Sequence, residues 1–194
     1  MPIELIPADI RESYAIFEWN HAIAILATDF PQEFQEILQV LRAFQLTRTD
    51  ILTQGGRKSP IAGKLDTPFY NMGWQEKQFS IHNTIDNAEV FIPTHKIDCY
   101  KNRIGVEVEW NNKDPFYDRD LNNFRLLFEL NAVSVGVIIT RCDELQRIFD
   151  DLGKGSSYGA STTHWSKLMP RIEGRGSGGC PVLAFGISDR LYVE

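Results

Sequence analysis

The sequence predicts a single α/β domain in which helices cover both faces of a mixed central β-sheet. Its 194 residues are an ordinary length for one domain. A hydrophobic fraction of 43%, with four Trp and twelve Phe, suits a folded core. Strand-like and helix-like segments interleave without internal repeats or a long linker. We therefore expect one domain over residues 1–194.

Two helices are predicted in the first half of the chain. Pro31 precedes EFQEILQVLRAF, whose apolar residues at 34, 37, 38, 41 and 44 have the spacing of an amphipathic helix. TQGGRKSP at 53–60 predicts a loop, and a short helix is expected over about 60–72. GWQEKQFSI, from residue 73, predicts the start of a strand.

The centre of the chain predicts a β-hairpin followed by a helix and a buried strand. HKIDCY at 95–100 and RIGVEVEW at 103–110 both alternate, and Lys101-Asn102 between them suits a tight turn. DRDLNNFRLLFEL predicts a helix with Leu121, Phe124, Leu127 and Phe128 on one side. SVGVIIT at 134–140 is a continuous apolar run, typical of a central strand.

Two more helices and a last strand are predicted towards the C-terminus. Asp143 is a candidate N-cap for the helix ELQRIFDDL. Another helix is expected over about 161–172, and PVLAFGI at 181–187 predicts a second buried strand.

Charge and composition exclude several classes of protein. A net charge of −6 argues against phosphate neutralisation over the whole surface, but the excess acid lies in residues 1–40. A local basic cleft is predicted over 153–176, where four bases face one acid. No apolar run is long enough to span a membrane, and no secretory signal is recognisable, so we expect a cytoplasmic protein. Dispersed Cys and His residues indicate neither disulfides nor a zinc site.

Three carboxylates in the central hairpin form the candidate site. The strand period of two directs Ile104, Val106 and Val108 to one face, and Gly105, Glu107 and Glu109 to the other. If Tyr100 pairs with Arg103, Asp98 lies opposite Gly105 and diagonal to Glu107, at ~7 to 8 Å between Cα atoms. The absent side chain of Gly105 would then leave space inside the acidic cluster.

Such a cluster predicts a metal ion, because close carboxylates repel one another and raise their own pKa values unless a cation lies among them. All-oxygen ligands with room for water and phosphate favour Mg²⁺, whose chemistry serves phosphodiester hydrolysis. Glutamates at alternate strand positions are also common on solvated sheet faces. The spacing alone therefore does not distinguish a site from a polar surface.

These features together resemble the restriction endonucleases grouped around BglII, BstYI and BamHI, within the PD-(D/E)xK nuclease superfamily. Asp98 followed by Glu107-Val108-Glu109 is similar to the family's catalytic motif, in a variant where the usual lysine is replaced. GWQEK at 73–77 is similar to the segment that supplies a fourth acidic residue, here Glu76. The resemblance is strongest from about residue 73 to 187, which we expect to be the catalytic core of a restriction-endonuclease-like fold.

The resemblance implies a role for each acidic residue. Asp98, Glu107 and the backbone carbonyl of Val108 would bind Mg²⁺, and Mn²⁺ would substitute for it. Glu109 would orient or deprotonate the attacking water, and Glu76 would assist a second ion. The replaced lysine leaves the identity of the general base open.

Two loops and a basic residue are the candidate DNA contacts. The loop after the catalytic strand offers amides that read adenine edges and a base for phosphate or guanine. GKGSSYGAS at 153–161 resembles the second recognition loop, although Gly/Ser segments are often plain connectors. The candidates are Asn111, Asn112, Lys113, Ser156, Ser157, Tyr158 and Arg175. Arg57 and Lys58, in the loop at 53–60, either contact DNA or are solvated.

The resemblance also implies partners. Cutting both strands of a palindrome in double-stranded DNA requires a homodimer, for which the helix at about 118–131 matches the family's dimerisation helix. A site with a central GATC, 5′ overhangs and a cognate DNA methyltransferase are expected. One alternative is a repair or methylation-directed nuclease of the same superfamily. Another is a DNA-binding or scaffold protein without catalysis.

Overall fold

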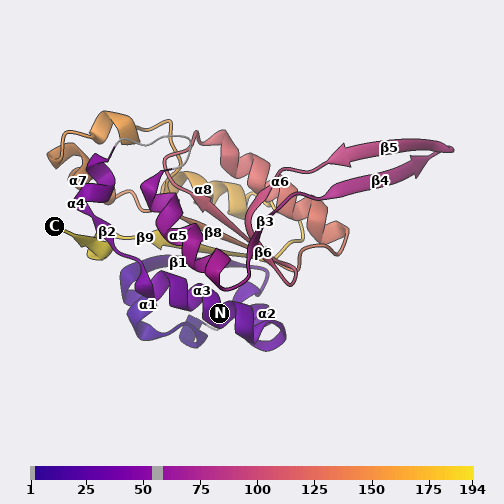
Figure 1. The fold of residues 1–194 in the computed structure, drawn as a ribbon, viewed down its shortest axis with the longest axis horizontal. Helices are drawn as coiled ribbons and strands as arrows, with labels where there is room; N and C mark the ends of the chain where they lie inside the picture. The colour runs from indigo at the N-terminus through magenta and orange to yellow at the C-terminus, as the bar shows by residue number, and fades with distance from the viewer. Residues whose placement is uncertain (1–2, 54–58) are drawn as a thin grey trace.

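A six-stranded mixed sheet lies at the centre of the computed structural model, which describes residues 3–53 and 59–194 (Figure 1). Its strand order is β1-β9-β8-β7-β6-β3, with β7, β8 and β9 parallel and the other neighbours antiparallel. The strands are β1 (Tyr14–Trp19), β3 (Gln75–Lys77), β6 (Ile97–Lys101), β7 (Ile104–Glu109), β8 (Val135–Arg141) and β9 (Val182–Ile187). The predicted α/β class with a mixed sheet is confirmed.

Helices cover both faces of this sheet, as predicted. The helices are α1 (Ala8–Ser13), α2 (Ala22–Asp29), α3 (Pro31–Ala43), α4 (Arg48–Leu52), α5 (Pro60–Asn71), α6 (Pro115–Glu129), α7 (Leu145–Asp151) and α8 (Trp165–Glu173). Short 3-10 turns are η1 (Ile3–Leu5), η2 (Gly155–Tyr158) and η3 (Asp189–Leu191). The helix expected from about 161 begins only at Trp165, because Thr162 and Thr163 bond to the loop after β7.

Two hydrophobic cores lie on opposite faces of the sheet. On one face, side chains of β7 such as Val106 pack with α1 to α5. On the other, Ile138 and Ala184 pack with α6 and α8, which contribute Phe124 and Leu168. The predicted division of β7 into two faces is therefore confirmed.

The acidic N-terminal region is a packing element of the domain. Strand β1 pairs antiparallel with β9 along its whole length, from Tyr14↔Ile187 to Trp19↔Val182. This strand was not predicted, because no turn residue separates it from α1 in the sequence. Short strands β2 (Leu46–Thr47) and β10 (Tyr192–Val193) pair parallel outside the central sheet.

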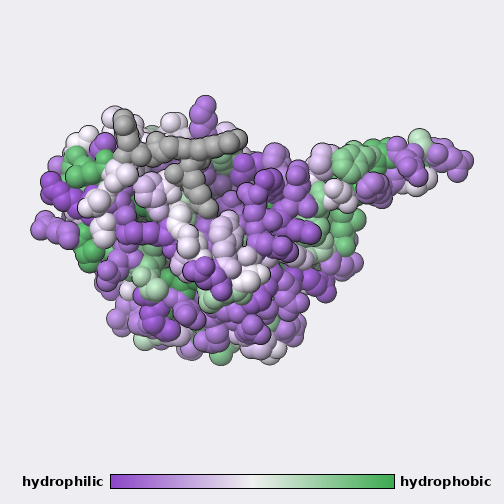
Figure 2. Space-filling view, viewed as in Figure 1, coloured by the Kyte–Doolittle hydropathy of each residue, from purple (hydrophilic) through white to green (hydrophobic). Residues whose placement is uncertain are grey.

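A second unpredicted element is a hairpin that projects from the body (Figure 1). Strands β4 (Ser80–Ile85) and β5 (Ala88–Pro93) are joined by Asp86-Asn87, both at positive φ. This is the backbone of a type I′ turn. Apolar residues line part of this arm (Figure 2), and the large exposed ones are Ile85, Val90, Phe91 and Ile92.

The turn of the β6–β7 hairpin lies one residue later than predicted. The two-residue loop is Asn102-Arg103, with φ of 44° and 70°. Lys101 stays in β6 opposite Ile104, where its ammonium donates to Glu36 Oε1 at 2.7 Å. The predicted pairing of Tyr100 with Arg103 is therefore wrong, since Tyr100 pairs with Gly105.

Asp143 caps a different helix from the one predicted. Helix α7 has Glu144 at its N-cap, without a side-chain hydrogen bond. Asp143 instead accepts bonds from the N–H and hydroxyl of Ser166, at 3.0 and 2.7 Å, at the start of α8. It therefore links the end of β8 to α8.

Two further predictions concern the cysteines and membrane-spanning helices. Cys99, Cys142 and Cys180 are buried and form no disulfide, as expected. Across 3–53 and 59–194, no helix has both the length and the apolar character needed to cross a bilayer.

Candidate active site

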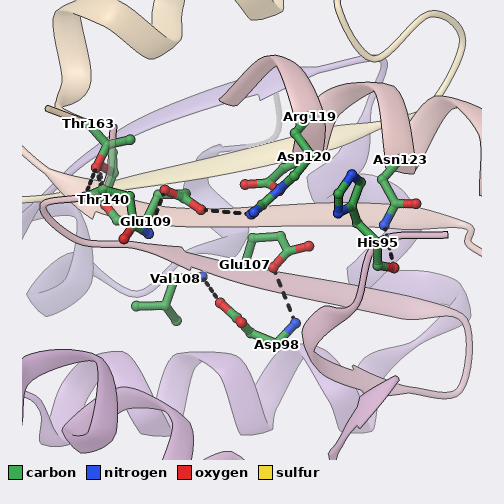
Figure 3. Close-up of polar contacts among 11 residues, drawn as sticks. His95, Asp98, Glu107, Val108, Glu109, Arg119, Asp120, Asn123, Thr140 and Thr163 are labelled. Carbon is green, nitrogen blue, oxygen red and sulfur yellow. Dashed lines mark hydrogen bonds and ion pairs between the residues drawn. The ribbon is translucent and has the colours of Figure 1, made fainter. Parts of the chain in front are cut away.

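Strands β6 and β7 diverge where the carboxylates lie (Figure 3). Their pairing ends at Cys99↔Val106, and side chains replace the next main-chain bonds. The Val108 N–H donates to Asp98 Oδ2 at 3.0 Å, and the Asp98 N–H donates to Glu107 Oε2 at 3.2 Å. The corrected register thus brings Asp98 directly towards Glu107 rather than diagonal to it.

Glu107 is one of the deeply buried acids of the site. Its side chain belongs to a residue that is 1% exposed, and Oε1 is buried without a hydrogen-bond partner. Burial raises its pKa well above the usual value, and the neighbouring Asp120 and Asp98 raise it further. A carboxylate in this position favours either a proton or a cation beside it.

Glu109 extends the cluster along the same strand face. Asn112 Nδ2 donates to its Oε2 at 2.9 Å, and Arg119 Nη2 lies 3.4 Å from its Oε1. Burial, followed by the proximity of Asp120, raises the pKa of Glu109 to about 9. Without a metal ion in the cluster, burial and Asp120 therefore favour the protonated form of Glu109.

Helix α6 supplies two charged residues that the sequence analysis missed. Figure 3 shows Arg119 and Asp120 reaching from this helix towards the acidic strand. Asp120 is 0% exposed, and its Oδ2 has no hydrogen-bond partner. The missed signal was its spacing, since Asp120 shares a helix face with the core residues Phe124 and Leu127.

Two glycines allow α6 to approach the sheet. A Cβ at Gly136 would lie 2.4 Å from Phe124 Cδ2, and one at Gly105 would lie 2.9 Å from Phe124 Cε1. The prediction that Gly105 leaves space within the acidic cluster is wrong, because Phe124 and Ile97 fill that space.

Glu76 lies on the edge strand β3, which pairs with β6, the strand that carries Asp98. Its side chain is 52% exposed and forms an ion pair with Lys96 at 2.5 Å. Its role at a second ion stays a prediction.

The two predicted recognition loops lie side by side at one end of β7. Thr163 N–H donates to Asn112 O at 2.8 Å, and Lys113 forms an isolated bridge with Thr162. Asn111 is at a φ of 59°, and its buried Oδ1 has no hydrogen-bond partner. The structure thus joins the first loop to residues 161–163, at the end of the predicted second loop.

Other predicted DNA contacts differ in exposure. Ser156, Ser157 and Arg175 are exposed, whereas the ring of Tyr158 is buried and stacks on Phe149 at 4.0 Å between centroids. Arg57 and Lys58 lie outside the described residues.

Two of the four cations of the predicted basic cleft form ion pairs with neighbouring acids. Lys167 pairs with Asp114 at 2.8 Å, and Arg171 pairs with Asp118 at 2.9 Å. These ion pairs join α8 to α6, so they bind the two helices of this face together.

The donor set fits a hard cation. In the part of the chain that the structure describes, no three His, Cys, Asp or Glu side chains form a complete metal-binding group. However, Glu107 Oε1 and Asp120 Oδ2 are buried oxygens without hydrogen-bond partners. Mg²⁺ prefers oxygen donors and keeps several waters, so few protein ligands suffice.

The fold is of the restriction-endonuclease-like class. Its mixed sheet carries a carboxylate cluster where strands β6 and β7 diverge. The model of the restriction endonuclease BglII/BglIII family matches residues 14–187, so the chain belongs to this family of type II restriction endonucleases. The predicted resemblance is confirmed, and the match begins well upstream of residue 73. A search of curated proteins gave no match.

Proposed function

We propose that this restriction endonuclease is Mg²⁺-dependent and hydrolyses phosphodiester bonds at a short palindromic site with a central GATC, leaving 5′ overhangs. The observation that carries the proposal is the approach of Asp98 to Glu107 where β6 and β7 diverge, with Glu109 on the same face of β7. Membership of the BglII/BglIII family supports it.

Asp98, Glu107 and the carbonyl of Val108 would hold Mg²⁺, with Mn²⁺ as a substitute. The bound ion would stabilise charge on the phosphate and make a water more acidic. Glu109, held by Asn112 and Arg119, would orient that water and accept its proton. Glu76 is proposed to assist a second ion.

We propose that the loop after β7, together with the second loop that is joined to it, recognises the bases. Asn111, Asn112 and Lys113 would read base edges or hold phosphate, with Ser156 and Ser157 from the second loop. Tyr158 would anchor that loop, because its ring lies in the core. Arg175 is proposed as a phosphate contact.

A homodimer would place one site on each strand of the palindrome. Leu121, Phe124 and Leu127 of α6 are buried within their own chain, so a dimer contact through this helix would use its remaining faces. We also propose a cytoplasmic location and a cognate DNA methyltransferase as a partner in the same system.

The test is digestion of plasmid DNA with Mg²⁺ or Mn²⁺, followed by run-off sequencing of the fragment ends. Glu107→Ala should lower the cleavage rate by roughly 10³-fold or more while DNA binding persists. Glu12→Ala, at an exposed position of α1, is the matched control.

Each alternative function has its own outcome. Absence of cleavage by the wild-type protein with either ion would favour a non-catalytic role. Cleavage that requires methylated plasmid, or that shows no fixed sequence, would favour a methylation-directed or repair nuclease of the same superfamily.

A further inference from the structure

Arg119 lies over the acidic cluster and contacts two of its members. Its Nε donates to Asp120 Oδ1 at 2.7 Å, and Nη2 lies 3.4 Å from Glu109 Oε1. The guanidinium also stacks 4.3 Å from the ring centroid of Phe116. These contacts fix the plane of the guanidinium relative to Glu109.

Exposure gives this side chain an inner and an outer side. The side chain of Arg119 is 30% exposed, whereas those of Glu109 and Asp120 are 2% and 0% exposed. The side chain of Arg119 therefore contacts the buried carboxylates and is also accessible in part to a molecule at the surface.

A cation between the acidic cluster and the DNA would lessen the repulsion between the carboxylates and a phosphate. A phosphodiester is anionic, so carboxylates at short range repel it in a poorly solvated site. Lys167 and Arg171, on the neighbouring α8, are already paired with Asp114 and Asp118. Arg119 is instead paired with Asp120 and Glu109 of the cluster itself.

We propose that Arg119 is a further functional residue of this site, positioning Glu109 with its inner side and contacting a DNA phosphate with its outer side. Asp120 is the residue that holds Arg119 in place. The inference rests on the proposed cleavage activity. An arginine suits both tasks, because its planar fork offers several N–H donors in fixed directions.

The experiment compares Arg119→Gln and Arg119→Lys with wild type. Gln keeps hydrogen-bond donors without the charge, and Lys keeps the charge without the fork. The control is Arg42→Gln, at an exposed position of α3, whose partner is the exposed Asp9. Cleavage is followed as kcat and KM, DNA binding is measured with Ca²⁺ at several salt concentrations, and Mg²⁺ binding is measured by calorimetry without DNA.

Arg119→Gln should lower kcat by about 10²-fold and reduce the salt dependence of DNA binding by about one phosphate contact. It should also bind Mg²⁺ more tightly, because a competing positive charge is gone. Arg119→Lys should restore the salt dependence but not kcat, and Arg42→Gln should match wild type in all three measurements.

The inference is overturned if Arg119→Gln is folded by circular dichroism and retains wild-type kcat and salt dependence. It is also overturned if Arg119→Lys restores kcat fully, since the fork would then have no role. Failure of the proposed function looks different, because wild type and Arg42→Gln would then be inactive as well.

Discussion

The two faces of β7 are equally shielded from solvent, but they contribute differently to the protein. Val106 and Val108 on one face are 0% and 4% exposed, and Glu107 and Glu109 on the other are each 1% exposed. Burying the valines stabilises the fold. Burying the glutamates opposes it unless a proton or cation accompanies them.

The two faces of this six-residue strand therefore have different roles. The apolar face stabilises the fold, and the acidic face carries the candidate site. The apolar face joins the larger core with α1 to α5, which holds the strand in place. The acidic face receives α6, whose Asp120 adds a further buried carboxylate. The free energy gained on the first face therefore offsets the cost of the second.

The largest expected effect is on the apolar face. Ile139→Ala, at a fully buried position of β8, should lower the free energy of unfolding by about 2 to 5 kcal/mol, because it leaves a cavity. Urea denaturation measures this loss. The kcat of the folded variant should stay near wild type, and a parallel fall in kcat would show that the two faces are coupled.

The second largest effect is expected from a variant that disturbs the packing of α6 on the acidic face of the sheet. Gly136→Ala places a Cβ against the ring of Phe124 and should cost about 1 to 3 kcal/mol. Cleavage should also fall, because α6 carries Arg119 and Asp120 over the site. Gly63→Ala in α5 meets open space and should instead stabilise by up to about 1 kcal/mol. Equal thermal shifts in the two variants would contradict this explanation.

The pH dependence of stability should sharpen the contrast. The pKa of Glu109 is about 9 in the folded chain against an ordinary value of 4.5, so the folded state binds the extra proton. Its contribution is complete below pH 4.5 and is lost as pH rises to about 9. The melting temperature of protein treated with a chelator should therefore fall between pH 5 and pH 9.

Glu109→Gln should make that decline shallower, because the amide does not titrate. Glu129→Gln, at an exposed site, should leave the slope unchanged. A melting temperature that rises over this range would mean that the glutamate is ionised when the site is metal-free.

The smallest effect concerns the turn that sets the register of both faces. Arg103 has a φ of 70°, a conformation that glycine adopts without strain. Arg103→Gly should raise the free energy of unfolding by about 0.4 to 1 kcal/mol, as measured by urea denaturation. A loss of stability would show that the arginine side chain contributes contacts that outweigh the strain.

The sequence predicted the parts of this site that depend on local periodicity. The alternation of β7 assigned Glu107 and Glu109 to one face, and the apolar spacing predicted α6. The register of the hairpin was wrong by two positions in the pairing, because Lys101-Asn102-Arg103 contains no glycine to mark the turn. Two adjacent non-glycine residues at positive φ give no such signal.

Local sequence patterns could not predict where α6 lies on the sheet. Its place on the sheet depends on the fit of Phe124 against Gly105 and Gly136, which come from two different strands. That fit brings Arg119 and Asp120 to the acidic face. The projecting β4-β5 hairpin was missed although Asp86-Asn87 offered a turn signal between alternating segments.

The three buried cysteines make the chain convenient for site-directed labelling. Burial raises the pKa values of Cys142 and Cys180 to about 12, so these thiols stay unreactive at neutral pH. A cysteine introduced at Thr84, on the projecting hairpin, would then carry a fluorophore selectively. The motion of that arm relative to a labelled duplex becomes measurable without first removing any native residue.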